Sequence, residues 1–196
     1  MTAPTTSAGA VLLTPAPAER TRPRVIGLDL SLSGTGVAGA TWAETIAGGA
    51  LPKTATREDE WARLRRIRGK LAGHIDSADL VVVEGLVATS SPSLQERAFL
   101  WWWAVGRCIN RETPYAVVQP STLKVYGTGS GRASKEDMVQ ELQRRRPALR
   151  FRGNNEADAA FLCMMGLDHL GSPMTPMPVT HRRAISSVLW PEQVTA

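Results

Sequence analysis

The feature that most constrains the fold is the stretch Arg24–Ala40, RVIGLDLSLSGTGVAGA, in which an apolar run ends on a carboxylate. The run Val25–Leu28 is typical of a buried strand. Serines and glycines follow and favour a tight turn, and Val37–Thr41 returns to strand character. Asp29, at the end of the first strand, is costly to bury unless a cation or hydrogen bonds compensate its charge. The pattern therefore predicts a strand, a turn and a second strand, with Asp29 as a metal ligand.

The rest of the chain alternates between strand and helix patterns. The segment Glu44–Leu51 completes a predicted three-stranded antiparallel meander, and the apolar Asp79–Gly85 follows a helix, which favours parallel pairing with the first strand. A fifth strand is expected at Tyr115–Val118. The predicted helices are Thr56–Ile75, a helix capped by Ser91 that runs to Arg111, Ser121–Tyr126, a helix from Ser134 to Pro147, and Asn155–Leu170 capped by Asn154. The prediction is an α/β fold with a five-stranded mixed sheet, three strands antiparallel and two parallel, flanked by helices.

Composition separates three segments and points to an anionic partner. Residues 1–23 are rich in Thr, Ala and Pro and are expected to form a disordered leader, residues 24–170 a single domain, and residues 171–196 a C-terminal tail.

The net charge of +5 and the pI near 9.8 favour nucleic acid as a partner. No apolar run approaches the roughly 20 residues that span a bilayer, so the protein is expected in the cytoplasm. Cys108 and Cys163 lie in apolar helical runs and are predicted to be buried, reduced thiols.

Three acids stand at positions where a core tolerates few charges. Asp29 and Glu84 each end an apolar strand, and Asp158 lies in the first turn of an apolar helix. If the two strands pair in parallel, both carboxylates emerge at one edge of the sheet and the helix can close over them. Clustered carboxylates repel one another unless a divalent cation lies among them, and oxygen ligands suit Mg²⁺ or Mn²⁺. The acids therefore predict a site for two ions that hydrolyses phosphodiesters.

The order of these motifs resembles the RuvC-type Holliday junction resolvases of the RNase H-like superfamily. The resemblance spans residues 24–170 and rests on four segments: GLDLSLSGTGVA (Gly27–Ala38), VVVEG (Val81–Gly85), QPSTLKVYGTGSGRASKEDMV (Gln119–Val139) and NNEADAAFL (Asn154–Leu162). It implies an RNase H-like fold and a homodimer that cuts four-way DNA junctions with a divalent metal. It also places Asp29, Glu84 and Asp158 on the catalytic positions of the family.

The resemblance further implies that Lys124 and Lys135 approach the scissile backbone, with Ser130 and Arg132 of the Gly-rich loop as neighbouring DNA contacts. A lysine beside a phosphate acts as a point charge that strengthens as charge develops.

Two positions depart from the cellular members of the family. Where those proteins carry a fourth acid, three residues before the last aspartate, this chain has Asn155, a neutral candidate ligand. Glu156 is then the alternative fourth acid, a version that looks more like phage-borne relatives. The family's aromatic residue three positions after the strand glutamate is Val87 here, which leaves a broader branched-DNA nuclease open.

Other interpretations of the sequence remain open. The same fold could serve a non-catalytic junction-binding protein, an RNase H-like nuclease of RNA–DNA hybrids, or a phosphotransferase of the actin-like class. Trp101–Trp103 spreads aromatic rings around a helix, which fits core packing and, as a second interpretation, the seam of a homodimer.

Overall fold

The structure is a computed structural model that describes residues 22–87, 90 and 92–192. Residues 1–21 of the predicted leader, and the predicted helix cap Ser91, lie outside the described residues. None of the described helices is long and apolar enough to span a membrane.

The predicted five-stranded mixed sheet is confirmed, with the spatial order β3-β2-β1-β4-β5. The strands are β1 (Val25–Asp29), β2 (Thr35–Ala38), β3 (Ala43–Ile46), β4 (Leu80–Glu84) and β5 (Tyr115–Val118). The first three pair antiparallel, whereas β4 pairs parallel with both β1 and β5. β1 is therefore central, and β3 forms one edge of the sheet.

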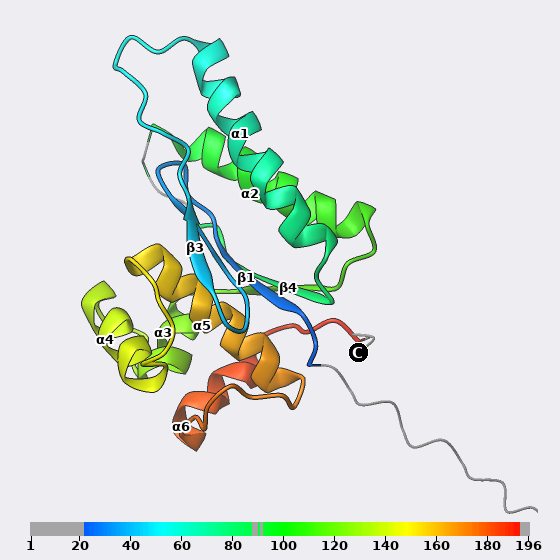
Figure 1. The fold of residues 1–196 in the computed structure, drawn as a ribbon, viewed down its shortest axis with the longest axis vertical. Helices are drawn as coiled ribbons and strands as arrows, with labels where there is room; N and C mark the ends of the chain where they lie inside the picture. Colours follow the sequence, from blue (N-terminus) through cyan, green and yellow to red (C-terminus); the bar gives the residue numbers. More distant parts are fainter. Residues whose placement is uncertain (1–21, 88–89, 91, 193–196) are drawn as a thin grey trace, which may run out of the picture.

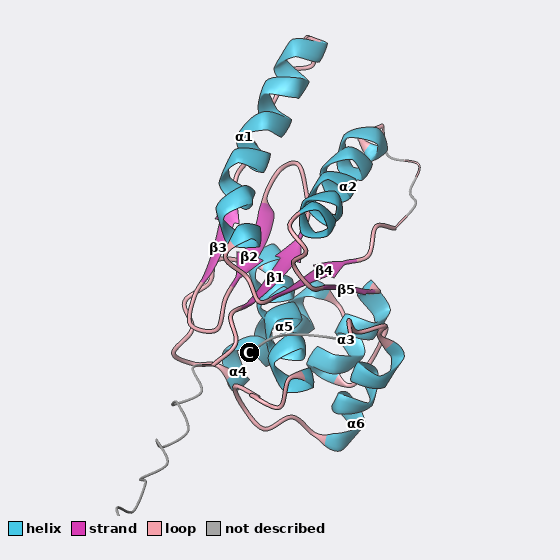
Figure 2. Ribbon diagram, turned by 90° about the vertical axis from the view of Figure 1, so that its right-hand side faces the viewer, coloured by secondary structure: helices cyan, strands magenta, loops and turns pink. Residues whose placement is uncertain are grey.

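Helices cover both faces of the sheet (Figures 1 and 2). One face carries α1 (Arg57–Asp76) and α2 (Leu94–Asn110), and the other carries α3 (Pro120–Thr128), α4 (Lys135–Arg145) and α5 (Asn154–His169). Each layer has its own hydrophobic core, because successive side chains of the strands point to opposite faces. Ile26 and Leu28 join the core beneath α1 and α2, whereas Val25 and Val82 join the core beneath α5.

Local sequence explains where several helices begin. Thr56 and Asp59 form a reciprocal capping box at the start of α1, and Ser134 and Asp137 form another at the start of α4. Each box satisfies two backbone N–H groups that would otherwise lack partners. The cap expected at Asn154 is wrong by one residue, because Gly153 precedes α5 without a side-chain cap.

The chain after Gly171, expected as a C-terminal tail, contains two helical elements, α6 (Val179–Arg182) and the 3₁₀-helix η1 (Arg183–Ser187). Ala184 lies in the core beneath α5. The guanidinium of Arg182 forms an ion pair of 2.9 Å with the buried carboxylate of Asp168. This part of the chain therefore packs against α3 and α5 as part of the folded unit.

Candidate active site

Parallel pairing brings the two strand-end acids to one edge and one face of the sheet. Gly27 of β1 pairs with Val82 of β4, so Asp29 and Glu84, each two residues further along, emerge side by side. Positions two apart on a strand share a face. Since Val25 and Val82 lie in the core beneath α5, both carboxylates are directed to the α5 side of the sheet. The two carboxyl groups lie close enough for each to shift the pKa of the other.

Helix α5 reaches these acids because two glycines let it approach the sheet closely. A Cβ atom on Gly27 would lie 2.0 Å from the carbonyl oxygen of Ala159, and one on Gly36 would lie 1.9 Å from that of Asn155. Both distances are far inside van der Waals contact, so only glycine allows this packing. Asp158 lies between these two contact points along α5. The helix therefore presents Asp158 beside the ends of β1 and β4.

Burial raises the pKa values of all three carboxyl groups, and repulsion by neighbouring carboxylates adds to the shift at Asp29 and Glu84. Desolvation and the charge of Asp158 raise the pKa of Asp29 from 3.8 to about 7. Desolvation, followed by the charge of Asp29, raises the pKa of Glu84 from 4.5 to about 8. The pKa of Asp158 is raised by desolvation to about 6. The three acids therefore lie in one electrostatically interacting, largely buried cluster.

Comparison with known proteins bears on the fold. No protein-family model matches the chain, and neither does any curated protein. Among solved structures, RuvC of Thermus thermophilus aligns with a TM-score of 0.53 and 21% identity over 79% of this chain and 99% of RuvC. The same organism's RuvC, solved in complex with a Holliday junction substrate, aligns with a TM-score of 0.54 and 20% identity over 80% of this chain and 99% of RuvC.

The chain has the RuvC fold.

Within this RuvC fold, three cations surround the acid cluster, and one of them escaped the sequence analysis. Lys135, the first residue of α4, and Lys124 of α3 both act to lower the pKa of Asp158. Arg97 of α2 acts in the same way on Asp29, from the opposite helical layer. The cluster therefore has positive charge on both sides, which suits an anionic substrate placed over the acids.

The position of Arg97 follows from the packing of α2 on β4. The indole N–H of Trp101 donates a hydrogen bond of 2.9 Å to the backbone oxygen of Glu84. Arg97 precedes Trp101 by four residues and so shares its helix face. The spacing was readable in the sequence, but nothing there showed that Trp101 contacts the end of β4.

The donor set fits a divalent cation. Asp29, Glu84 and Asp158 offer only carboxylate oxygens, the ligands that Mg²⁺ and Mn²⁺ prefer. A cation among them would offset the repulsion that raises their pKa values. Among the residues that the structure describes, however, no group of three or more histidine, cysteine, aspartate or glutamate side chains is placed so that it could hold a metal ion as it stands. The acids thus converge without a preformed shell.

Both candidates for a fourth ligand are engaged elsewhere. The Asn155 amide donates a hydrogen bond to the backbone oxygen of Gly34, which ties α5 to the β1–β2 turn. The Glu156 carboxylate is only 3% exposed and accepts hydrogen bonds from the Thr45 hydroxyl at 2.8 Å and from the backbone N–H of Arg152 at 2.5 Å. The structure therefore brings Asp29, Glu84 and Asp158 together and directs Asn155 and Glu156 toward β2 and β3.

The predicted DNA contacts of the Gly-rich loop line a separate cavity. Ser130 and Arg132 border a space of about 670 Å³ between α4 and the C-terminal segment, which His181 also lines. The Ser130 hydroxyl accepts a hydrogen bond of 3.3 Å from the backbone N–H of Arg132 and so shapes the loop. Ser130 and Arg132 are thus placed around the entrance to α4, where Lys135 begins the helix.

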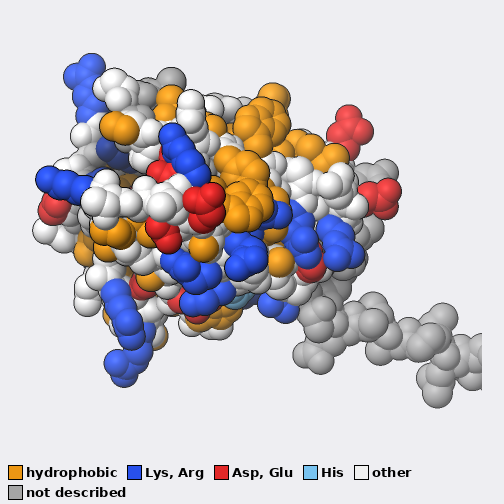
Figure 3. Space-filling view, turned by 90° about the horizontal axis from the view of Figure 1, so that it is seen from above, with side chains coloured by type: hydrophobic (Ala, Val, Ile, Leu, Met, Phe, Trp, Pro, Cys, Tyr) orange, Lys and Arg blue, Asp and Glu red, His pale blue; other side chains and the backbone are white. Residues whose placement is uncertain are grey.

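An aromatic cluster lies on the opposite helical layer. Trp61, Phe99 and Trp102 are 49%, 38% and 63% exposed. The Arg68 guanidinium lies 5.7 Å from the Trp61 ring and 5.4 Å from the Phe99 ring. Figure 3 shows a hydrophobic patch on the face seen from above, with acidic side chains beside it and basic ones around it.

Proposed function

We propose that this protein is a metal-dependent, structure-selective DNA endonuclease that cuts Holliday junctions or other branched DNA. The observation that carries the proposal is the convergence of Asp29, Glu84 and Asp158 at one edge of the sheet, with cations on both sides. A protein that only binds DNA gains nothing from buried carboxylates that repel a phosphate. Their cost is explained if they hold cations and act on the phosphodiester.

Asp29, Glu84 and Asp158 would hold Mg²⁺ or Mn²⁺, two ions in our proposal. Such ions supply charge stabilisation for the attacking and leaving oxygens of an in-line displacement and favour deprotonation of the attacking water. Because Asp29 lies on the central strand and interacts with both Glu84 and Asp158, it is the natural shared ligand. Because the pKa values of Asp29 and Glu84 are raised to about 7 and about 8, these acids hold protons near neutral pH, and a bound cation would displace them, so cation binding should strengthen as pH rises.

The protein's own cations would position the scissile phosphate. Lys124 and Lys135 from the α3–α4 layer and Arg97 from the α2 layer would bracket the phosphate and stabilise the charge that develops on its oxygens. The likeness to RuvC, which has been solved with a Holliday junction substrate, supports branched DNA as the ligand class. We propose that the protein acts as a homodimer in the cytoplasm, with the exposed aromatic cluster on α1 and α2 as part of the dimer seam.

Cleavage of a panel of nucleic acids tests this function. Labelled four-way junction, Y-fork, linear duplex and RNA–DNA hybrid are incubated with the protein in Mg²⁺ or Mn²⁺. We expect the branched DNA to be cut, and we expect Asp29→Asn to abolish cleavage while junction binding in EDTA persists. Asp79→Asn, which removes a carboxylate that accepts a hydrogen bond from the Arg24 backbone N–H outside the cluster, is the matched control and should cleave normally.

The outcomes separate the alternatives. Junction binding without turnover in either metal favours a non-catalytic junction-binding protein. Preferential cleavage of the hybrid favours an RNase H-like activity. Cleavage retained by Asp29→Asn contradicts the assignment of the acid cluster.

A further inference from the structure

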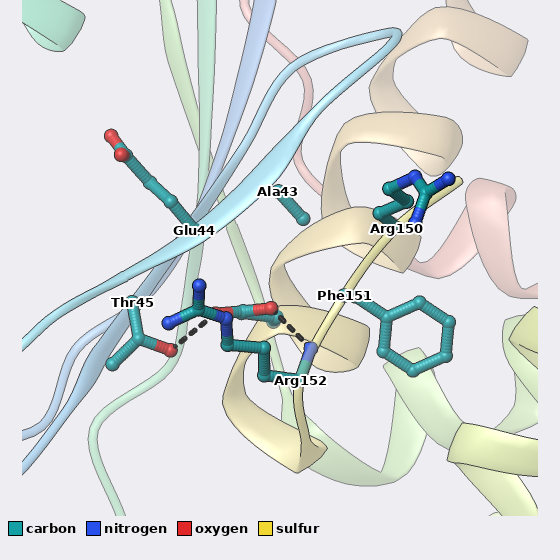
Figure 4. A pocket seen from close by; sticks show the side chains of 7 residues that line it. Ala43, Glu44, Thr45, Arg150, Phe151 and Arg152 are labelled. Carbon is teal, nitrogen blue, oxygen red and sulfur yellow. Dashed lines mark hydrogen bonds between the residues drawn. The ribbon is translucent and has the colours of Figure 1, made fainter.

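A second cavity lies at the β3 edge of the sheet, on the far side of β2 from the acid cluster. It encloses about 550 Å³ between β3 and the loop that joins α4 to α5 (Figure 4). Its lining residues are Ala43, Glu44 and Thr45 of β3, Arg150, Phe151 and Arg152 of the loop, and Glu156 of α5. The proposed cleavage mechanism uses none of them.

The wall of this cavity is held in place by Glu156. Its carboxylate accepts one hydrogen bond from the Thr45 hydroxyl and one from the Arg152 backbone N–H, and so joins β3, the loop and α5. The Phe151 side chain packs against the core beneath α5 and points to the opposite side of the loop from Arg152 (Figure 4). The loop that carries the two arginines is therefore held by the Phe151 side chain and by the Arg152 backbone N–H, which reduces the entropy lost when the arginines bind a ligand.

The charges at the cavity favour an anion. Arg150 and Arg152 are both exposed, and neither forms an ion pair with a residue that the structure describes. Glu44 is paired instead with His74 at 2.9 Å, and its side chain points away from Thr45 and Arg152 (Figure 4). The Glu156 carboxylate is buried and already takes two donors. The free charges at the rim are thus two guanidinium groups, whose planar forks match phosphate oxygens.

The strand spacing gives the distance between this cavity and the acid cluster. Two strand spacings separate β3 from β1, which is about 10 Å. One DNA strand rises about 3.4 Å per nucleotide along the helix axis and also winds around that axis, so this span corresponds to about one to two nucleotides of backbone. We infer that Arg150 and Arg152 form a second phosphate-binding site, which holds the DNA backbone about one to two nucleotides from the phosphate at the acid cluster. The inference rests on the proposed function and reassigns Glu156 from metal ligand to positioning residue for this loop.

Junction binding in EDTA, followed by fluorescence anisotropy over a range of salt concentrations, tests the site without cleavage. Arg150→Ala/Arg152→Ala should weaken binding about tenfold or more and lower the slope of log K against log salt by about one for each phosphate that the variant no longer neutralises. The control is Arg65→Ala/Lys70→Ala, which removes the same charge from exposed positions on α1. Equal effects of the two double variants would overturn the inference.

Neutral methylphosphonate linkages locate the bound phosphate. With the wild-type protein, one linkage about one to two nucleotides from the cleavage site should weaken binding, and with Arg150→Ala/Arg152→Ala the same linkage should have no further effect. Glu156→Gln, which loses one acceptor, should reproduce part of the binding defect while the Mg²⁺ concentration for half-maximal cleavage stays unchanged. A shifted Mg²⁺ requirement would return Glu156 to the metal site and overturn its reassignment.

A titration with inorganic phosphate separates this site from the nuclease proposal. The Nε–H signals of Arg150 and Arg152 should shift on addition of phosphate, and the double variant should lose that response. Shifts without any junction binding would reject the DNA assignment in favour of a small phosphate ligand. No shift and no binding defect would reject the site, whereas cleavage retained by Asp29→Asn rejects only the nuclease proposal.

Discussion

Replacing Gly27 with alanine should separate α5 from the sheet. A Cβ atom at this position would lie 2.0 Å from the Ala159 carbonyl oxygen and 2.6 Å from the Cys163 nitrogen, both of them backbone atoms of α5. Ordinary contact begins at 3.4 Å, so the helix would have to retreat by about 1.4 Å, the difference between 3.4 Å and 2.0 Å. A flexible side chain could rotate away from the new methyl group, but a helix backbone packed in the core has to move as a unit.

The cost follows from overpacking. Added methyl groups in a packed core typically cost about 1–3 kcal/mol, and the backbone neighbours of Gly27 favour the upper end. In a protein of this size about 3 kcal/mol corresponds to a fall in Tm of roughly 6–12 °C. The shift also moves Asp158 away from Asp29, and a misplacement of about 1 Å in a catalytic site can cost about 100-fold in rate.

The assay combines urea and thermal unfolding with single-turnover cleavage of a four-way junction in Mg²⁺. Gly69→Ala is the matched control, because Gly69 is an exposed residue of α1 with no atom within 4 Å of the added Cβ. That variant should gain about 0.5–1 kcal/mol from helix propensity and should cleave normally. If Gly27→Ala unfolds at the wild-type urea concentration, the close packing of α5 on β1 is incorrect.

Three further changes test the electrostatics. Because the folded-state pKa of Asp29 is raised from 3.8 to about 7, the folded protein binds more protons than the unfolded chain between these pH values and loses stability as pH rises through them. At pH 8 without metal, the free energy of unfolding of Asp29→Asn should therefore exceed that of the wild type by on the order of 2–4 kcal/mol in urea. An equal difference at pH 4 would contradict this. Arg97→Ala should slow single-turnover cleavage about tenfold, and Arg97→Lys should recover part of that rate, whereas the control Arg65→Ala leaves the rate unchanged. A wild-type rate in Arg97→Ala would exclude Arg97 from phosphate binding. Arg182→Ala leaves the Asp168 carboxylate, 2% exposed, without its cation, and should lower the free energy of unfolding by about 3 kcal/mol; an unchanged urea midpoint would show that this ion pair does not hold the C-terminal segment.

The sequence by itself determined the sheet and the identity of its acids. Hydrophobic periodicity marks the strands. Because β1 and β4 pair in parallel, their carboxyl ends meet at the same edge of the sheet. The strand ends therefore had to place Asp29 and Glu84 together once β1 and β4 were identified.

Tertiary packing decided which residue of α5 joins them and what surrounds the cluster. Successive residues of a helix turn by about 100°, so Glu156 and Asp158 point about 200° apart, and only the seating of α5 on Gly27 and Gly36 selects between them. That packing depends on close contacts between the backbone of α5 and the backbones of β1 and β2, and such contacts leave no periodic pattern in the sequence. Arg97 reaches Asp29 for the same reason, because the position of α2 is set by packing against β4 and not by the residues next to it in sequence.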